Sequence, residues 1–317
     1  MARYLDFATT DVFTSSPFAG NPLAIVFLPS APDSTPLTQA QKQLIAREFN
    51  LSETIFVHPA SESSERTVDI FTTDEELPFA GHPTIGSAAW LLSSAAASGG
   101  AVAAPEALRT KSGRIPISVV APRFAAQAVS VGAAIAHDTR LHAARFPAAE
   151  LLRLQPALAP YVAPSAEFPV FSIVKGMSQV HVELPSLEAL AAVATTTGSV
   201  SCEYLDEGWG SSHIVTYFFV RGVRDEVLGR EVIRTRMIEG ALEDPATGSA
   251  ASGLASYLTL TGGAEGVHKY DVVQGVEMGR RSEIGVDVGL SGDGKIKSVD
   301  LVGSAVEISS GRIRIPE

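Results

Sequence analysis

Two segments, one in each half of the chain, carry residues suited to acid–base chemistry. The octapeptides that begin at His82 and Asp244 align without a gap, five of their eight positions are identical, and their starts lie 162 positions apart in a chain of 317 residues. In this alignment a histidine and an aspartate take the same position, each directly before a proline. Two different titratable groups suit a proton transfer that needs an acid and a base. The pattern predicts an internal duplication with His82 and Asp244 in one acid–base site.

The same two segments predict where a substrate would bind. Each is expected to follow a strand and to open an Ala-rich helix, whose first N–H groups attract anions. Gly86 and Gly248 would let the backbone come close to a ligand, and Thr247 and Ser249 lie beside Gly248. We expect a small carboxylate between two helix N-termini that face one another across the cleft between two lobes.

Simpler interpretations of these residues stay open at this point. Strings such as Gly-Ser-Ala-Ala recur by chance at the starts of helices rich in small residues. His82 could cap its own loop, and Asp244 before Pro245 could be an ordinary helix N-cap. Ser249 could bond only to backbone.

The hydrophobic pattern around these segments predicts more strands than helices. Strands are expected at 4–13, 23–28, 54–57, 68–72, 114–120, 170–174, 179–184 and 214–220. Thr38 followed by Gln41 predicts a capped helix, and residues 78–83 predict a loop before a helix from about Thr84 to Ala97. A meander is expected at the end, with short strands at 271–278, 283–290, 296–301, 306–308 and 312–315. This mixture indicates an α+β fold, not regular βαβ alternation.

Composition excludes several classes of function. The formal net charge is -11, with Lys and Arg scattered, which argues against a nucleic-acid partner. The single Cys202 excludes an internal disulfide, a Cys-rich zinc site and an iron–sulfur cluster. Composition therefore excludes metal centres that depend on several cysteine ligands.

A second group of expectations concerns location. The N-terminus lacks the apolar core of a signal peptide. The uncharged stretch 84–105 is mostly Ala, Ser and Gly, which favours a buried helix over a membrane span. We expect a soluble cytoplasmic protein with no membrane partner.

Longer motifs show that the chain resembles the PhzF-like phenazine biosynthesis family, which has the diaminopimelate epimerase-like fold. The matching segments run in family order over residues 11–280: Asp11-Val12-Phe13, Phe18-Ala19-Gly20-Asn21-Pro22, Asn50-Leu51-Ser52-Glu53-Thr54, Glu76 to Thr84, Glu243 to Ala250 and Gln274 to Arg280.

The resemblance implies a fold and an activity. Two pseudo-symmetric lobes would each wrap a mixed or antiparallel sheet round a central helix. We expect an N-terminal lobe at 1–125, joined by a C-terminal strand at 303–317, and a C-terminal lobe at 126–302. The implied protein is a cofactor-independent isomerase that binds no metal and no organic cofactor. It would form a homodimer and move a proton within a small unsaturated carboxylic acid.

The resemblance also assigns residues. Glu53 would be the proton shuttle, with His82 and Asp244 as its catalytic partners, and Gly81 and Ser249 would line the substrate pocket. A solvent-exposed carboxylate at a strand start is the ordinary alternative for Glu53. One cysteine cannot support the two-cysteine mechanism of racemases with a similar fold.

The chain departs from the family pattern at three positions, and other functions stay open. Asp69, Thr73 and Arg281 stand where the family often has Arg, Pro and Pro, and the Ala-rich stretch 127–165 matches nothing named. These departures leave the substrate open. The alternatives are a Glu53-dependent epimerase or racemase, and a catalytically silent binding or scaffold protein.

Overall fold

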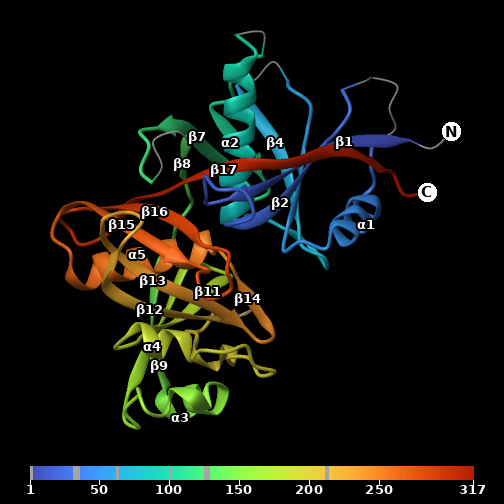
Figure 1. The fold of residues 1–317 in the computed structure, drawn as a ribbon. Helices are drawn as coiled ribbons and strands as arrows, with labels where there is room; N and C mark the ends of the chain where they lie inside the picture. Colours follow the sequence, from blue (N-terminus) through green and yellow to red (C-terminus); the bar gives the residue numbers. More distant parts are fainter. Residues whose placement is uncertain (1–2, 31–35, 62–63, 100–101, 125–128, 211–213) are drawn as a thin grey trace. The chain divides into compact units, whose positions relative to one another are not determined.

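The chain divides into two compact units in the computed structural model, which describes residues 3–30, 36–61, 64–99, 102–124, 129–210 and 214–317 (Figure 1). The first unit contains Met1–Ile135 and Leu301–Glu317, and the second contains Ala136–Asp300. The expected boundary between residues 125 and 126 lies outside the described residues. Strand β8 (Ser130–Ala134) belongs to the first unit, where it pairs with β7 (Gly113–Val120).

The first unit is a mixed sheet wrapped around helix α2 (Gly81–Ala97). Strands β2 and β3 are parallel, as are β4 and β6, and the other neighbouring pairs are antiparallel. Besides β7, β8 and α2, its elements are β1 (Tyr4–Val12), β2 (Asn21–Phe27), α1 (Gln39–Phe49), β3 (Thr54–Val57), β4 (Glu65–Phe71), β5 (Glu76–Leu77), β6 (Ala107–Thr110) and the C-terminal part of β17 (Ile296–Arg314). Helix α1 begins with the predicted capping box of Thr38 and Gln41.

Helix α2 is central because its side chains are small and apolar on every side, which is typical of a buried helix. The predicted loop at 78–83 is wrong at its end, since the helix begins at Gly81. Pro83 is tolerated there because N–H groups in a first turn have no acceptor within the helix.

The second unit repeats this arrangement around helix α5 (Gly248–Gly262). Strands β11 and β12 are parallel, as are β13 and β15, and the remaining neighbours are antiparallel. The elements are β9 (Arg140–Pro147), α3 (Ala148–Leu154), η1 (Pro156–Leu158), β10 (Glu167–Val174), β11 (Met177–Glu183), α4 (Leu187–Ala191), η2 (Cys202–Tyr204), β12 (Ile214–Asp225), β13 (Arg230–Glu239), β14 (Leu242–Asp244), β15 (Gly266–Gln274) and β16 (Ser282–Leu290).

The two units have the same topology, so the duplication is present, but its predicted register is wrong by five residues. Strand β5 ends at Leu77 and α2 begins at Gly81, whereas β14 ends at Asp244 and α5 begins at Gly248. Both differences are 167 positions (244 minus 77, and 248 minus 81), not 162. His82 therefore corresponds to Ser249, and Asp244 is a strand residue rather than a helix N-cap.

Two glycines in the helices fit the corrected register. Gly86 and Gly253 also lie 167 positions apart. A Cβ at Gly86 would come within 2.6 Å of Leu23 and Val12 on the sheet, and one at Gly253 would overlap Gln179 of β11. Gly86 thus serves helix–sheet packing. The prediction that it lets the backbone come close to a ligand was wrong.

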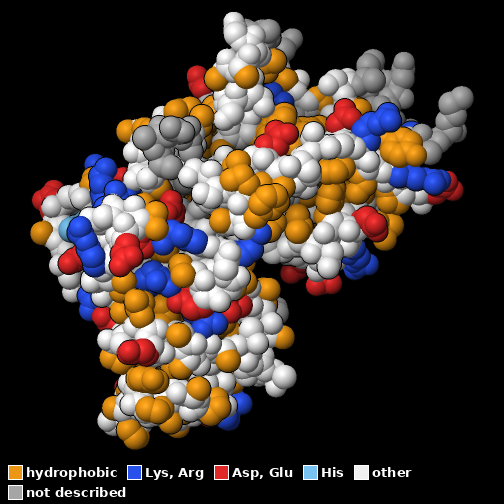
Figure 2. Space-filling view, in the orientation of Figure 1, with side chains coloured by type: hydrophobic (Ala, Val, Ile, Leu, Met, Phe, Trp, Pro, Cys, Tyr) orange, Lys and Arg blue, Asp and Glu red, His pale blue; other side chains and the backbone are white. Residues whose placement is uncertain are grey.

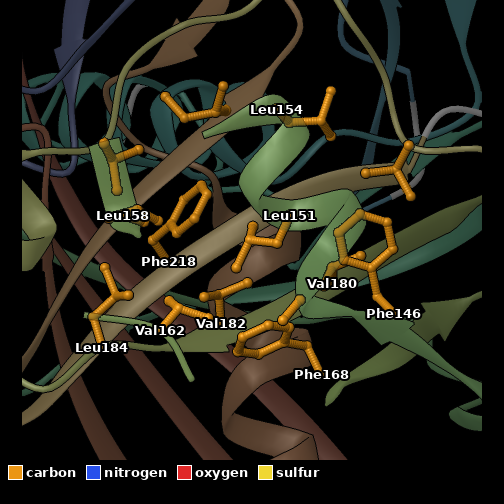
Figure 3. Close-up of a cluster of buried hydrophobic side chains, with 14 of the residues drawn as sticks. Phe146, Leu151, Leu154, Leu158, Val162, Phe168, Val180, Val182, Leu184 and Phe218 are labelled. Carbon is orange, nitrogen blue, oxygen red and sulfur yellow. The ribbon is translucent and has the colours of Figure 1, made fainter. Parts of the chain in front are cut away.

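The other face of the second unit's sheet holds an apolar core under α3 and α4 (Figure 3). Val180 and Val182 of β11 point into this core, together with Phe218 of β12 and Leu151 of α3. Because side chains alternate along a strand, Gln179 and His181 face α5 instead. The described part of the stretch 127–165, which had no prediction, supplies β8, β9, α3 and η1.

The chain ends in one long strand instead of the three short ones that were predicted. Strand β17 runs for 19 residues and pairs with β1 from Ala305 to Arg314. None of the described helices has the length and apolarity needed to cross a bilayer. On the face drawn in Figure 2, Lys and Arg side chains lie among Asp and Glu side chains.

Candidate active site

Glu53 and His82 come together in the first unit. Glu53 directly precedes β3, and His82 is the second residue of α2. The Nδ1 atom of His82 lies 3.5 Å from an Oε atom of Glu53. The His82 side chain is buried, and that of Glu53 is 17% exposed. In this pair the Glu53 carboxylate is accessible to solvent, whereas the His82 imidazole is buried.

The surroundings of Glu53 shift its titration toward neutral pH. Burial raises the pKa of Glu53 to about 7, although a hydrogen bond from the Ser52 hydroxyl lowers this pKa somewhat. A carboxyl group with this pKa is populated in both protonation states near neutrality, as a proton shuttle requires. The electrostatics of the first unit therefore suit Glu53 to acid–base work.

A turn between β1 and β2 lies next to this pair. The Asp11 carboxylate accepts a 2.7 Å hydrogen bond from the Phe18 N–H, which closes the turn. Phe13 and Phe18 both have left-handed backbone, with φ of 60° and 64°. The turn leads to Asn21, whose side-chain oxygen lies 3.5 Å from the Ser52 hydroxyl. Strained non-glycine backbone is frequent near functional sites, and this turn joins two of the motifs that carried the family resemblance.

Asp244, Thr247, Gly248 and Ser249 come together in the second unit. Asp244 ends β14, Thr247 is the N-cap of α5, and Gly248 and Ser249 are its first two residues. The Thr247 hydroxyl donates a 2.5 Å hydrogen bond to the Asp244 carboxylate. The side chain at the N-cap thus points at Asp244 instead of capping the helix.

Neither central helix has a side-chain cap at its N-terminus. The N-cap of α2 is Ala80, which has no polar side chain, and the N-cap of α5 is Thr247, whose side chain makes no capping hydrogen bond. Gly81 and Gly248 open the two helices. Uncapped helix starts with a glycine in first position suit the binding of an anion by backbone N–H groups.

Two residues that the sequence analysis gave no role complete the second group. The Gln274 amide donates to the Asp244 carbonyl oxygen at 2.7 Å and to the Thr247 hydroxyl oxygen at 3.0 Å. The Tyr217 hydroxyl donates to the Gln274 side-chain oxygen at 2.9 Å. Gln274 stood in a matching segment and could have been noticed. Tyr217 lies in an apolar strand, where no sequence pattern marked it.

A buried serine–histidine pair elsewhere in the second unit is structural. The Ser172 hydroxyl lies 2.8 Å from Nε2 of His142. The backbone N–H of Asp206 donates to Nδ1 of His142 at 3.0 Å, so the ring proton is on Nε2 and points at Ser172. Ser172 in turn bonds Ser178 at 2.6 Å. A histidine that donates to the serine cannot be its general base.

Other groups with possible chemistry lie apart from these clusters. Among the residues that the structure describes, no three His, Cys, Asp or Glu side chains are grouped so as to hold a metal ion. Cys202 is exposed in η2. Since Cys202 is the only cysteine of the chain, a pair of catalytic thiols is excluded.

Comparisons with known proteins agree on the family. The family model described as phenazine biosynthesis-like protein matches residues 10–311. A trans-2,3-dihydro-3-hydroxyanthranilate isomerase of Pseudomonas fluorescens is 34% identical over 87% of this chain and 88% of its own length.

Solved structures agree on the fold. A PhzF-family phenazine biosynthesis protein of Bacillus anthracis has a TM-score of 0.74, with 20% identity over 98% of this chain and 99% of its own. A predicted epimerase of Pseudomonas aeruginosa has a TM-score of 0.65, with 25% identity over 98% and 99%. The predicted α+β fold is confirmed, and the names of the relatives support an isomerase.

Proposed function

The chain belongs to the phenazine biosynthesis-like (PhzC-PhzF) family, and on this premise we propose that it is an isomerase that shifts a proton within a small unsaturated carboxylic acid. The observation that carries the proposal is the Glu53 carboxyl group. Its pKa is raised to about 7 and its side chain stays 17% exposed. A group that is half ionised near neutral pH and open to a ligand can take a proton and return it.

Glu53 acts in the proposed reaction first as base and then as acid. The carboxylate removes a proton from an activated carbon of the substrate. The electron pair moves through the conjugated system. The proton on Glu53 exchanges with solvent, because the side chain is 17% exposed, and Glu53 then returns a proton at another carbon. His82, whose Nδ1 atom lies 3.5 Å from the Glu53 carboxyl group, and Asp244 place the substrate and handle a second proton that Glu53 does not carry.

The substrate's carboxylate binds to backbone in this proposal. Each unit by itself offers N–H groups at the uncapped start of its central helix, at Gly81 of α2 in the first unit and at Gly248 and Ser249 of α5 in the second. This would explain how a chain with a net charge of -11 holds an anion without a cluster of Lys and Arg. The proposed reaction needs neither a metal ion nor an organic cofactor, so treatment with a chelator should leave turnover unchanged.

The substrate named for a relative is the first one to test. The protein should be incubated with trans-2,3-dihydro-3-hydroxyanthranilate and related unsaturated acids in D2O, and the products should be analysed by NMR. The proposal predicts a product with a moved double bond and deuterium at the newly protonated carbon. The proposal is contradicted if the protein is folded and none of the acids in the panel is converted.

A Glu53-dependent epimerase is the second candidate, favoured by the 25% identity with the predicted epimerase. The same experiment separates the two reactions. An epimerase introduces deuterium at one stereocentre and leaves every double bond in place.

The proposal further includes a homodimer in the cytoplasm, and sedimentation of the purified protein tests the dimer.

A further inference from the structure

Three polar side chains behind Asp244 form a directional hydrogen-bond relay in the second unit. They are Tyr217 of β12, Gln274 at the end of β15, and Thr247 at the start of α5. The sheet register brings them together, because Met237 of β13 pairs with both Tyr217 and Asp244. Thr235 of the same strand pairs with Gln274. All three relay side chains are thus placed by neighbouring strands and by the start of helix α5.

The donors and acceptors of the Gln274 amide fix its orientation. Its oxygen accepts from the Tyr217 hydroxyl at 2.9 Å and from the Thr247 backbone N–H at 3.4 Å. The Thr235 hydroxyl lies 3.1 Å from the Tyr217 oxygen and 3.4 Å from the same Gln274 oxygen, so it donates to one of these two oxygens when the single Tyr217 proton is donated to Gln274. Its nitrogen donates to the Asp244 carbonyl oxygen and to the Thr247 hydroxyl oxygen. A rotated amide would place its N–H groups against the Thr247 backbone N–H and its oxygen against the Asp244 carbonyl oxygen. Neither backbone group can exchange its role as donor or acceptor, whereas a hydroxyl can. Gln274 is fully buried, so such mismatched groups would have no water to replace the lost bonds.

This orientation determines where the Thr247 proton points. The Thr247 hydroxyl oxygen already accepts from Gln274, so its own proton is free to be donated to the Asp244 carboxylate at 2.5 Å. The direction of donation therefore runs from Tyr217 through Gln274 and Thr247 to Asp244. Burial raises the pKa of the Tyr217 phenol, which keeps the first donor protonated.

We propose that Tyr217 and Gln274 are positioning residues that act through Thr247 to hold the Asp244 carboxylate in one rotamer, as a hydrogen-bond acceptor. This inference rests on the proposed function insofar as Asp244 faces the substrate. The relay itself is independent of which substrate is bound. It gives Asp244 a fixed direction before any ligand arrives, which is the preorganisation that acid–base groups need.

The test compares two tyrosine-to-phenylalanine variants. Tyr217→Phe removes the first donor of the relay. Tyr270→Phe is the matched control, because the Tyr270 hydroxyl bonds Thr259 at 2.9 Å on the same helix α5 but outside the relay. Both variants lose one phenol hydroxyl from the second unit. Because Tyr217 is fully buried and Tyr270 is half-buried, the free energy of unfolding is measured for both variants, and kinetics are compared under conditions in which both are folded.

Kinetics give the first measurement. Tyr217→Phe should lower kcat about tenfold to a hundredfold with KM changed less than threefold, and Tyr270→Phe should change neither more than twofold. Thr247→Val should lower kcat as much as Tyr217→Phe does, whereas Thr247→Ser should keep most of the wild-type kcat. The double variant Tyr217→Phe/Thr247→Val should lower kcat no more than either single variant. Equal kcat values for Tyr217→Phe and Tyr270→Phe would overturn the inference.

A second measurement does not depend on activity, so a failure of the proposed function can be told apart. Amide hydrogen exchange at residues 247–250 should speed up at least tenfold in Tyr217→Phe and stay unchanged in Tyr270→Phe. If the wild type converts no acid but this difference appears, the proposed function fails and the relay stands. If both variants exchange alike at these amides, the relay is wrong whatever the activity.

Discussion

Glu53 is the residue whose surroundings are most unusual for its type. Burial raises its pKa to about 7, from an ordinary value of 4.5. A shift of this kind costs stability, because the native state resists the charge that the unfolded chain accepts readily. Burial of Glu53 thus both lowers the stability of the native state and suits the carboxyl group to proton transfer. Each of these two effects can be tested separately.

The first test is the pH dependence of catalysis. Glu53 must be ionised to accept the substrate's proton, so kcat/KM should rise with pH through an apparent pKa of about 7 and then level off. A profile of kcat/KM from pH 5 to 9 measures this. A plateau that already begins at pH 5 would mean that the base has an ordinary carboxyl pKa.

The second test is the stability of Glu53→Gln. Since the native pKa of Glu53 is raised, this carboxyl group contributes its full share of the wild-type stability below pH 4.5. That contribution is lost as the pH rises through about 7. Glutamine stays neutral, so the variant should be more stable than the wild type by about 1–3 kcal/mol at pH 8 and equal to it at pH 4. Denaturant unfolding at both pH values checks this. Equal stability at pH 8 would show that Glu53 is well solvated.

His181 shows the opposite sign of shift. Within the described residues neither of its ring nitrogens has a hydrogen-bond partner, and the ring lies 5.7 Å from Phe171 and 5.1 Å from Tyr257. Burial lowers the pKa of His181 to about 3, so the native state keeps the ring neutral.

Acid should therefore destabilise the wild type more than His181→Phe. The stability that neutral His181 contributes is present above pH 6.5 and falls with pH by up to about 1.4 kcal/mol per unit. The variant keeps the aromatic packing without this loss. Unfolding free energies at pH 7, 6, 5 and 4 should show a shallower slope for His181→Phe, and parallel slopes would contradict the assignment.

At the scale of elements, the two central helices depend on glycines that face the sheet. A Cβ added at Gly86 would lie 2.6 Å from the side chains of Leu23 and Val12. Both of these side chains are fully buried. Gly262, at the end of α5, has open space around the same position. The two sites thus separate close packing from helix propensity.

Gly86→Ala should lower the free energy of unfolding by about 1–3 kcal/mol, because the overlap must be relieved in a tightly packed interior. Gly262→Ala is the control, and it should be neutral or stabilising by up to about 1 kcal/mol. Chemical denaturation of both variants measures this difference. A stabilised Gly86→Ala would mean that α2 can move away from the sheet at little cost.

At the scale of the whole molecule, the sequence predicted the architecture better than the register. Strand patterns predicted an α+β fold, the repeated segments predicted two similar lobes, and the family resemblance implied a central helix in each. The structure confirms this fold. The register failed because identity was sought in Gly-Ser-Ala-Ala, a string that any buried helix of small residues tends to contain. The ends of strands β5 and β14, together with the first residues of helices α2 and α5, show that His82 corresponds to Ser249.

The candidate site was predicted in part for a similar reason. The repeated segments pointed to His82 and Asp244, and the family resemblance pointed to Glu53. Glu53 and His82 do lie together in the structure. Tyr217 and Gln274 were missed because their partners are distant in sequence. The Tyr217–Gln274 hydrogen bond joins residues 57 positions apart, and no local pattern predicts it.

The C-terminal strand is a feature of the whole chain. Residues 301–317 belong to the first unit, where β17 pairs with β1 and Gly303 packs against Phe13. Removing residues 303–317 should therefore increase amide exchange throughout the first unit and leave the second protected. Exchange that rises equally in both units would show that they unfold as one.

The central claim is that Glu53 moves the proton, and Glu53→Gln tests it most directly. Wild-type protein and variant should be incubated with a converted acid in D2O, and deuterium in the product and in recovered substrate should be counted by mass spectrometry. The account predicts that the variant, although folded and more stable at pH 8, loses both turnover and deuterium incorporation by about 100-fold to 10,000-fold. Deuterium incorporation at the wild-type rate would contradict it.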